Sequence, residues 1–164
     1  MAQKIAINGY GRIGRCVHRI LASQANPELD IVAINDITSP AVLAHLLKYD
    51  SVHRRFQGTV EAREKSIVVN GKEIPIFAEM DPTKLPWKQL GVALVMESTG
   101  KFTDKAGAGK HIQAGAERVI ISAPGKELDG MFVYGVNHKT YDKSKHVVVS
   151  NASCTTNCLA PMAK

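Results

Sequence analysis

A glycine-rich segment near the amino terminus has the spacing of a nucleotide-binding turn. Gly9, Gly11 and Gly14 form the pattern G-x-G-x-x-G directly after the apolar run of residues 4–8. Between a strand and a helix, Gly9 can make the tight turn, Gly11 lets a pyrophosphate approach the backbone, and Gly14 brings helix and strand close together. The apolar stripe over residues 13–21 predicts that helix, whose free N–H groups and dipole would face the phosphates.

One carboxylate lies at the distance from these glycines that would select the dinucleotide. Asp36 directly follows the apolar run of residues 31–35 and lies 22 residues beyond Gly14. A carboxylate there accepts hydrogen bonds from the adenosine ribose hydroxyls and repels a 2′-phosphate. The spacing therefore predicts NAD as the cofactor, against the alternative of a glycine turn with an unrelated surface Asp.

Small polar residues follow a third predicted strand, over residues 93–97. Ser98, Thr99 and Gly100 would lie at the carboxyl edge of the sheet, where open α/β sheets bind their ligands. By themselves these residues make only an ordinary loop, so their assignment depends on the glycine turn beside them.

The cysteine best placed to act as a nucleophile is Cys154. The segment 150–158 follows a predicted strand and begins a helix, which puts Cys154 near a helix N-terminus, where the thiolate is favoured. Cys16 is expected to be a packed thiol, because it lies mid-helix beside the apolar stripe. Cys158 could trap an oxidised Cys154, but a disulfide within one helix turn has poor geometry, so packing is its expected role too. Neither has a His or Cys partner at ligand spacing, so no metal site is predicted.

Short apolar runs alternate with helical patterns along the chain, which is typical of a parallel sheet with crossover helices. The pattern predicts a Rossmann-type, doubly wound α/β fold with a mostly parallel sheet. Predicted strands cover 4–8, 31–35, 93–97, 118–122, 131–136 and 146–150, and predicted helices cover 13–21, 41–47 and 104–114 with Thr103 as the last N-cap. Segments 59–62, 66–69 and 72–77 predict an antiparallel hairpin insertion, since Asn70-Gly71 favours a type I′ turn.

The overall composition excludes several classes of protein. The 164 residues are 45% hydrophobic, enough for one sizeable core, and the longest apolar run is far too short to cross a bilayer. Lys and Arg number 21 and give a formal net charge of +6, but they are scattered and not interleaved with aromatic residues, which disfavours nucleic acid as the partner. Three cysteines in a chain of this kind indicate free thiols and a cytoplasmic setting.

Several motifs together resemble one enzyme family. The block Ser153-Cys154-Thr155-Thr156-Asn157-Cys158 with Leu159-Ala160-Pro161 is similar to the active-site segment of phosphorylating glyceraldehyde-3-phosphate dehydrogenases. Similar motifs occur in the same order at 7–15, 46–51, 97–100, 121–124 and 135–137, so the resemblance covers essentially the whole chain.

This resemblance implies roles for individual residues. Cys154 would be the nucleophile, Ser153 and Thr155 would contact the substrate or the attacking phosphate, and the NAD would be held by Gly9, Gly11, Arg12, Ile13, Asp36, Met80, Ser98, Thr99, Gly100 and Ser122. Met80 stands where the family often has Arg, and adenine binding survives that change if the contact is made by the backbone.

The resemblance also implies a domain organisation. Residues 1–150 would form the NAD-binding domain, and residues 151–164 would begin a catalytic domain that supplies the catalytic His and a C-terminal helix packed onto the first domain. The 164-residue chain alone is therefore expected to be inactive. The implied substrates are glyceraldehyde 3-phosphate and inorganic phosphate, and the implied full-length assembly is a homotetramer. Two alternatives stay open, an erythrose-4-phosphate dehydrogenase and a non-catalytic NAD-binding module.

Overall fold

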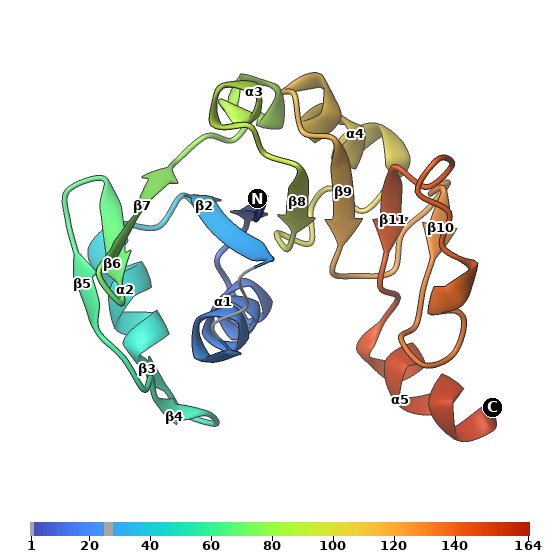
Figure 1. The fold of residues 1–164 in the computed structure, drawn as a ribbon, viewed down its shortest axis with the longest axis horizontal. Coiled ribbons are helices and arrows are strands. Elements are labelled where there is room, and N and C mark those ends of the chain that lie inside the picture. The colour runs from blue at the N-terminus through green and yellow to red at the C-terminus, as the bar shows by residue number, and fades with distance from the viewer. Residues whose placement is uncertain (1, 25–27) are drawn as a thin grey trace.

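The computed structural model describes residues 2–24 and 28–164, and its centre is a mostly parallel sheet with helices on both faces (Figure 1). Over those residues the sheet has nine strands in the order β10-β11-β9-β8-β1-β2-β7-β6-β5. The strands are β1 (Gln3–Asn8), β2 (Leu29–Asn35), β5 (Val60–Ala62), β6 (Ser66–Val69), β7 (Lys72–Phe77), β8 (Leu94–Glu97), β9 (Arg118–Ile121), β10 (Gly130–Met131) and β11 (Val148–Ser150). A separate small hairpin pairs β3 (Tyr49–Asp50) with β4 (Arg54–Arg55).

Helices cover the two faces of this sheet unevenly. They are α1 (Arg12–Gln24), α2 (Pro40–Lys48), α3 (Trp87–Leu90), α4 (Lys105–Gln113) and α5 (Cys154–Ala163), with 3-10 turns at Pro82–Lys84 and His138–Thr140. Figure 1 shows α1 and α2 on one face and α3 and α4 on the other, while α5 lies near the β10 end. This arrangement confirms the doubly wound α/β fold that the sequence predicts.

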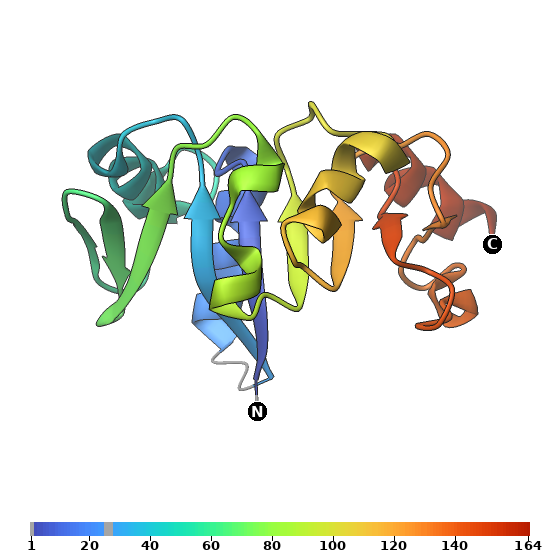
Figure 2. The same ribbon diagram turned by 90° about the horizontal axis from the view of Figure 1, so that it is seen from above.

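Alternating side chains of the central strands build a core on each face. Ile7 and Ile34 pack with residues of α1 and α2, whereas Ala6 and Ala33 pack against Trp87 on the α3 and α4 side. Strands buried on both faces carry nearly continuous apolar residues, because every side chain meets a helix. The two cores hold the carboxyl ends of β1, β2, β8 and β9 along one edge, which is uppermost in Figure 2.

The hairpin insertion is confirmed and joins the main sheet. β5, β6 and β7 pair antiparallel, and β7 pairs parallel with β2. Asn70 and Gly71 have φ angles of 51° and 82°, the positive values that a type I′ turn requires.

Three predicted boundaries are wrong. The N-cap of α4 is Asp104 and not Thr103, because the Asp104 side chain accepts a hydrogen bond from the Gly107 N–H at 2.7 Å. The strand predicted over 131–136 ends at Met131, since the chain turns where Val133 N–H donates to Asn137 Oδ1. The last strand begins at Val148, and the N–H groups of Val147 and Val148 donate instead to the Asp129 carboxylate.

Candidate functional site

The turn between β1 and α1 is built so tightly that two of its glycines cannot carry a side chain. Gly9 has a φ of +88°, and a Cβ there would lie 2.6 Å from the backbone nitrogen of Thr99. A Cβ on Gly14 would lie 2.5 Å from the carbonyl oxygen of Gly9. The turn therefore lies directly against the loop after β8 on one side and against the first turn of α1 on the other, as the sequence pattern predicts.

Gly11 differs from both, because a Cβ at this position would meet nothing within 4 Å. The open space lies where α1 begins, and the first turn of α1 carries no acidic side chain. Free N–H groups, the positive end of the helix dipole and open space together suit a phosphate group.

Asp36 follows the end of β2 with both carboxylate oxygens anchored to the backbone. Oδ2 accepts from Tyr10 N–H at 2.7 Å, and Oδ1 accepts from Thr38 N–H at 2.9 Å. Each oxygen retains a second lone pair for a ligand hydroxyl. The carboxylate is therefore fixed in direction beside the glycine turn.

A cleft of about 450 Å³ opens at this edge of the sheet. Six of the predicted cofactor residues line it, together with Asn8, Asn35, Ile37, Glu79, Lys101 and Phe102; the six are Gly9, Gly11, Asp36, Met80, Ser98 and Thr99. The Ser98 hydroxyl is buried at the cleft and has no hydrogen-bond partner among the described residues. A buried hydroxyl normally has a partner, so this orphan atom fits a cleft that is completed by a polar ligand.

Three features of the cleft suit parts of NAD. The fixed carboxylate of Asp36 suits ribose hydroxyls, the space over Gly11 suits a pyrophosphate, and Ile37 and Phe102 offer apolar surface for a base. Met80 contributes an exposed side chain, while the backbone of its neighbour Glu79 is held by Asn35 through both N–H and C=O. The residues present therefore fit this cofactor.

Four other predicted cofactor residues do not line the cleft. Ile13 is 49% exposed on the first turn of α1, Gly100 has a φ of +72° in an exposed loop, and the backbone N–H of Ser122 donates to the Glu97 carbonyl. Arg12 points to the β3–β4 hairpin, where its Nη1 lies 3.1 Å from Asp50 Oδ2.

The Arg12–Asp50 ion pair ties the start of α1 to that hairpin. Hydrogen bonds from the backbone N–H groups of His53 and Val52, with a further contribution from the Arg12 charge, lower the pKa of Asp50 to about 2. Asp50 is therefore ionised at neutral pH and pairs with the Arg12 guanidinium, which does not line the cleft.

Cys154 is the first residue of α5 and is exposed. A strained turn delivers it from β11, because Ala152 has a φ of +66° and its N–H donates to the Ser150 hydroxyl at 2.8 Å. Ser153 is the N-cap, and its Oγ accepts from Thr156 N–H at 2.9 Å and lies 2.9 Å from Thr155 Oγ1. The predicted position of Cys154 at a helix N-terminus is confirmed.

The other two cysteines follow their predictions only in part. All three are free thiols, and Cys16 is half-buried in α1. Cys158 is exposed, so its predicted packed role is wrong for this chain: α5 buries none of its residues in the chain described.

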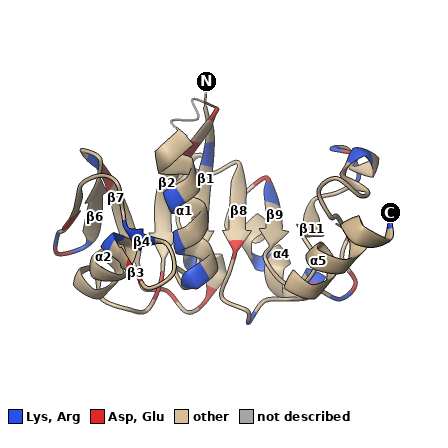
Figure 3. Ribbon diagram, turned by 90° about the horizontal axis from the view of Figure 1, so that it is seen from below, with Lys and Arg blue, Asp and Glu red and all other residues tan. Residues whose placement is uncertain are grey.

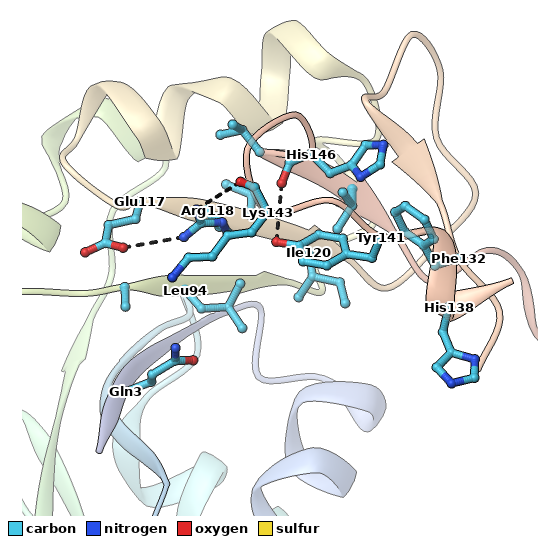
Figure 4. Close-up of a pocket in the computed structure, with 14 residues that line it drawn as sticks. Gln3, Leu94, Glu117, Arg118, Ile120, Phe132, His138, Tyr141, Lys143 and His146 are labelled. Carbon is cyan, nitrogen blue, oxygen red and sulfur yellow. Dashed lines mark hydrogen bonds and ion pairs between the residues drawn. The ribbon is translucent and has the colours of Figure 1, made fainter. Parts of the chain in front are cut away.

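A second hollow, of about 430 Å³, lies on the α1 side of β8 and β9, away from the glycine turn (Figure 4). Leu94, Ile120 and Phe132 give it an apolar lining, and Arg118 crosses it to donate to the Lys143 carbonyl at 3.2 Å. It brings together none of the predicted site residues.

Sequence reasoning missed a buried polar group beneath the cleft. Asn8, Asn35 and Glu97 are the final residues of β1, β2 and β8, and each is almost fully buried. A polar residue that ends an apolar strand is the sequence signal that could have revealed them.

Two further observations concern the described part of the chain. It contains no helix long and apolar enough to cross a membrane, and no group of three His, Cys, Asp or Glu residues that could hold a metal ion. Its Lys and Arg residues are spread over helices, strands and loops (Figure 3).

Comparison with known proteins identifies the family. A family model described as the NAD binding domain of glyceraldehyde 3-phosphate dehydrogenase matches residues 3–105, which include the whole glycine turn and the cleft. The chain belongs to this family of glyceraldehyde 3-phosphate dehydrogenase NAD-binding domains. NAD is therefore the cofactor of this domain.

Similar proteins extend the match beyond residue 105, across the rest of the chain. It is 58% identical over 161 residues to glyceraldehyde-3-phosphate dehydrogenase 1 of Bacillus cereus, covering 98% of the chain and 48% of that protein. It is 56% identical over 164 residues to the enzyme of Geobacillus stearothermophilus, covering 100% and 48%, and 55% identical over 161 residues to that of Thermotoga maritima, covering 98% and 48%. The chain thus spans about half the length of these relatives.

Proposed function

We propose that this chain is the cofactor-binding part of an enzyme that oxidises glyceraldehyde 3-phosphate with NAD and inorganic phosphate. The observation that carries the proposal is the exposed Cys154 at the first residue of a helix that follows a strand of the NAD-binding sheet. Relatives at 55–58% identity are named glyceraldehyde-3-phosphate dehydrogenase, which favours this substrate over erythrose 4-phosphate.

In the proposed cofactor site, the Asp36 carboxylate accepts hydrogen bonds from the adenosine ribose hydroxyls. The backbone around Gly9 and Gly11 binds the pyrophosphate. The start of α1, at Arg12 and Ile13, contributes its N–H groups. Ser98 and Thr99, whose backbone packs against Gly9, form the wall beside the glycine turn, with Gly100 and Ser122 further along the same sheet edge. Met80 takes part through its backbone near the adenine.

The proposed chemistry takes place on the Cys154 sulfur. The thiolate attacks the aldehyde carbon, and loss of hydride from that carbon leaves a thioester. NAD, when bound, accepts the hydride. Inorganic phosphate then attacks the thioester carbon, which releases the thiolate and gives the acyl phosphate 1,3-bisphosphoglycerate. Ser153 and Thr155, the residues before and after Cys154 in the chain, have hydroxyls 2.9 Å apart and offer them to the substrate or to the incoming phosphate.

The proposal includes the division of the protein. Residues 1–150 form the NAD-binding domain, and residues 151–164 begin a catalytic domain that supplies the proton acceptor. A later helix of that domain covers the hollow over Leu94 and Ile120. The assembled enzyme is a cytoplasmic homo-oligomer, as the family resemblance implies.

The test uses the intact protein, meaning this chain together with the proposed catalytic domain. The protein is mixed with glyceraldehyde 3-phosphate, NAD and phosphate, and the reaction is monitored by the absorbance of NADH. We expect phosphate-dependent turnover that Cys154→Ser abolishes and that Cys158→Ser leaves near the original rate. Erythrose 4-phosphate in place of the triose tests the sibling activity. NAD binding without turnover of either aldehyde would instead support a non-catalytic NAD-binding module.

A further inference from the structure

A relay of three hydrogen bonds runs beneath the cleft from Glu79, which follows β7, to Glu97 at the end of β8, and each of the three donates toward Glu97. The Glu79 N–H donates to Asn35 Oδ1 at 2.8 Å, Asn35 Nδ2 donates to Asn8 Oδ1 at 2.6 Å, and Asn8 Nδ2 donates to Glu97 Oε2 at 2.5 Å. Asn35 Nδ2 also donates back to the Glu79 carbonyl at 2.8 Å. The amide orientations follow from the first bond, since a backbone N–H can only donate. The relay therefore ends on the Glu97 carboxylate.

A second branch reaches the same carboxylate from α3 and α4, which cover the face of the sheet that carries Ala6, Ala33 and Val95. The indole N–H of Trp87 donates to His111 Nδ1 at 3.0 Å. Because indole nitrogen cannot accept, Nδ1 carries no proton and Nε2 does. His111 Nε2, 3.1 Å from Glu97 Oε2, is thus a donor from a neutral ring.

Thr99 provides the remaining two donors, its backbone N–H at 2.7 Å and its hydroxyl, both to Glu97 Oε1. Glu97 is 1% exposed and accepts four hydrogen bonds, two on each oxygen. A carboxylate has about four lone-pair sites, so the ionised side chain is saturated and a neutral one would leave donors unmatched. No described Lys or Arg pairs with Glu97, so hydrogen bonds alone hold its charge.

We propose that Glu97 is a positioning residue for the cofactor, which orients the polar groups that form the floor of the cleft. Asn8, Asn35 and Thr99 all line the cleft, and each is fixed in direction by the relay that ends on Glu97. The Thr99 hydroxyl uses its proton on Glu97 and accepts from Lys101 N–H, so it faces the cleft as an acceptor only. This inference rests on the proposed placement of NAD in the cleft.

The relay predicts what replacement of one atom will do. In Glu97→Gln, Oε1 can still accept from Thr99, but the new amide nitrogen faces Asn8 Nδ2 and His111 Nε2, which are both donors. If the Asn8 amide rotates to face the new amide with its oxygen, its nitrogen then faces Asn35 Nδ2, another donor. If Asn35 rotates as well, its nitrogen faces the Glu79 N–H, a backbone donor that cannot rotate. We expect NAD affinity to fall by about tenfold to a hundredfold, since each unsatisfied buried group has a large effect.

A second substitution should restore the hydrogen bonds lost in Glu97→Gln. It moves the carboxylate from position 97 to position 8, the other end of the hydrogen bond between Asn8 and Glu97. In the double variant Asn8→Asp with Glu97→Gln, the carboxylate introduced at position 8 can accept from Asn35 Nδ2 and from the amide introduced at position 97. It can also accept from His111 Nε2, which lies 3.2 Å from Asn8 Nδ2 in the unmodified protein. The amide oxygen at position 97 keeps both bonds from Thr99. The single variant Asn8→Asp instead sets two carboxylates in contact and is expected to be the least stable of the three.

The experiment measures NAD binding by calorimetry on the intact protein, with thermal unfolding to confirm that each variant is folded at the assay temperature. Ser66→Ala is the control, because it removes a part-buried hydrogen bond from Ser66 on β6 to the carboxylate of Glu73 on β7, and neither residue lines the cleft. We expect near-normal affinity for the control, weak binding for Glu97→Gln, and tighter binding for the double variant than for Glu97→Gln.

Two results would overturn the inference: normal NAD affinity in Glu97→Gln, or a double variant that binds and folds no better than Glu97→Gln. If Glu97→Gln does not fold, a double variant that folds and binds NAD still supports the inference. If neither variant folds, the inference is overturned. Absence of NAD binding in the unmodified protein would contradict the proposed cofactor site itself, which distinguishes the two failures.

Discussion

The backbone N–H of Tyr10 donates a hydrogen bond of 2.7 Å to Asp36 Oδ2, which joins the glycine turn to the carboxylate that follows β2. This bond sets the distance between the groups proposed to hold the pyrophosphate and the adenosine ribose. It also means that Asp36 contributes both to the shape of the site and to its charge.

Replacing Asp36 should therefore change cofactor selectivity. We expect Asp36→Ala to weaken NAD binding about tenfold, through the lost charged hydrogen bonds, and to narrow the preference for NAD over NADP because the repulsion of a 2′-phosphate is removed. Calorimetric titration with both dinucleotides measures the two effects. Asp30→Ala, at the amino end of the same strand, is the control and should keep the preference. Equal affinity of the unmodified protein for NADP would contradict the role of Asp36.

The glycines of the turn should separate into a functional and a structural class. Gly11→Val places its side chain in open space, so we expect little change in the melting temperature but a loss of NAD affinity of at least about tenfold. Gly14→Ala sets a Cβ against the Gly9 carbonyl, so its melting temperature should fall. Calorimetry and thermal unfolding of both variants check this. Tight NAD binding by Gly11→Val would show that the phosphates lie elsewhere.

The exposed thiols Cys154 and Cys158 offer an internal comparison of reactivity. Both lie on α5, but only Cys154 is at its N-terminus, so iodoacetamide should label Cys154 first near neutral pH. Peptide mass spectrometry after brief treatment measures the order. Ser153→Ala, which removes the helix cap, should reduce the difference between the two thiols. Faster labelling of Cys158 would refute an activating effect of the helix start.

The buried pair Tyr10 and His18 should make stability depend on pH. Burial, and to a smaller degree the charge of Lys72, lowers the pKa of His18 from 6.5 to about 4, and Tyr10 Oη lies 2.5 Å from its Nδ1. Between pH 6.5 and 4 the unfolded chain binds a proton that the folded chain does not. The contribution of neutral His18 to the free energy of unfolding is therefore fully present above pH 6.5. The free energy of unfolding falls by about 3 kcal/mol as the pH drops to 4.

Chemical denaturation of the intact protein across that pH range tests the effect of His18. His18→Gln should flatten the pH dependence, although its stability at pH 7 can also differ. His45→Gln, an exposed histidine on α2, should retain the slope of the unmodified protein. An unchanged slope in His18→Gln would show that other groups cause the pH dependence.

Much of the site can be predicted from local sequence, because the chemistry of each part is encoded within a few residues. The glycine spacing predicts the turn, Asn70-Gly71 predicts the hairpin, and Ser153-Cys154 predicts a capped helix start. Each depends on backbone conformations that only certain residue types adopt, or on a side chain that reaches a nearby N–H group. The doubly wound fold follows from the alternation of strand and helix patterns.

Two of the placements that failed depend on contacts between distant segments. The Asp129 carboxylate accepts hydrogen bonds from the N–H groups of Val147 and Val148, so the last strand starts later than its apolar residues suggest. Arg12 pairs with Asp50, 38 residues away, and points away from the cleft.

Residue types and their spacing are enough to predict the parallel sheet, the glycine turn, the acidic residue after β2 and the cysteine at a helix start. The four hydrogen bonds that Glu97 accepts become visible only in the folded chain, because their donors Asn8, Thr99 and His111 come from β1, the loop after β8, and α4. Sequence periodicity reports which face of an element is buried. It does not report which buried polar atoms meet across the sheet, since that depends on register and on side-chain direction.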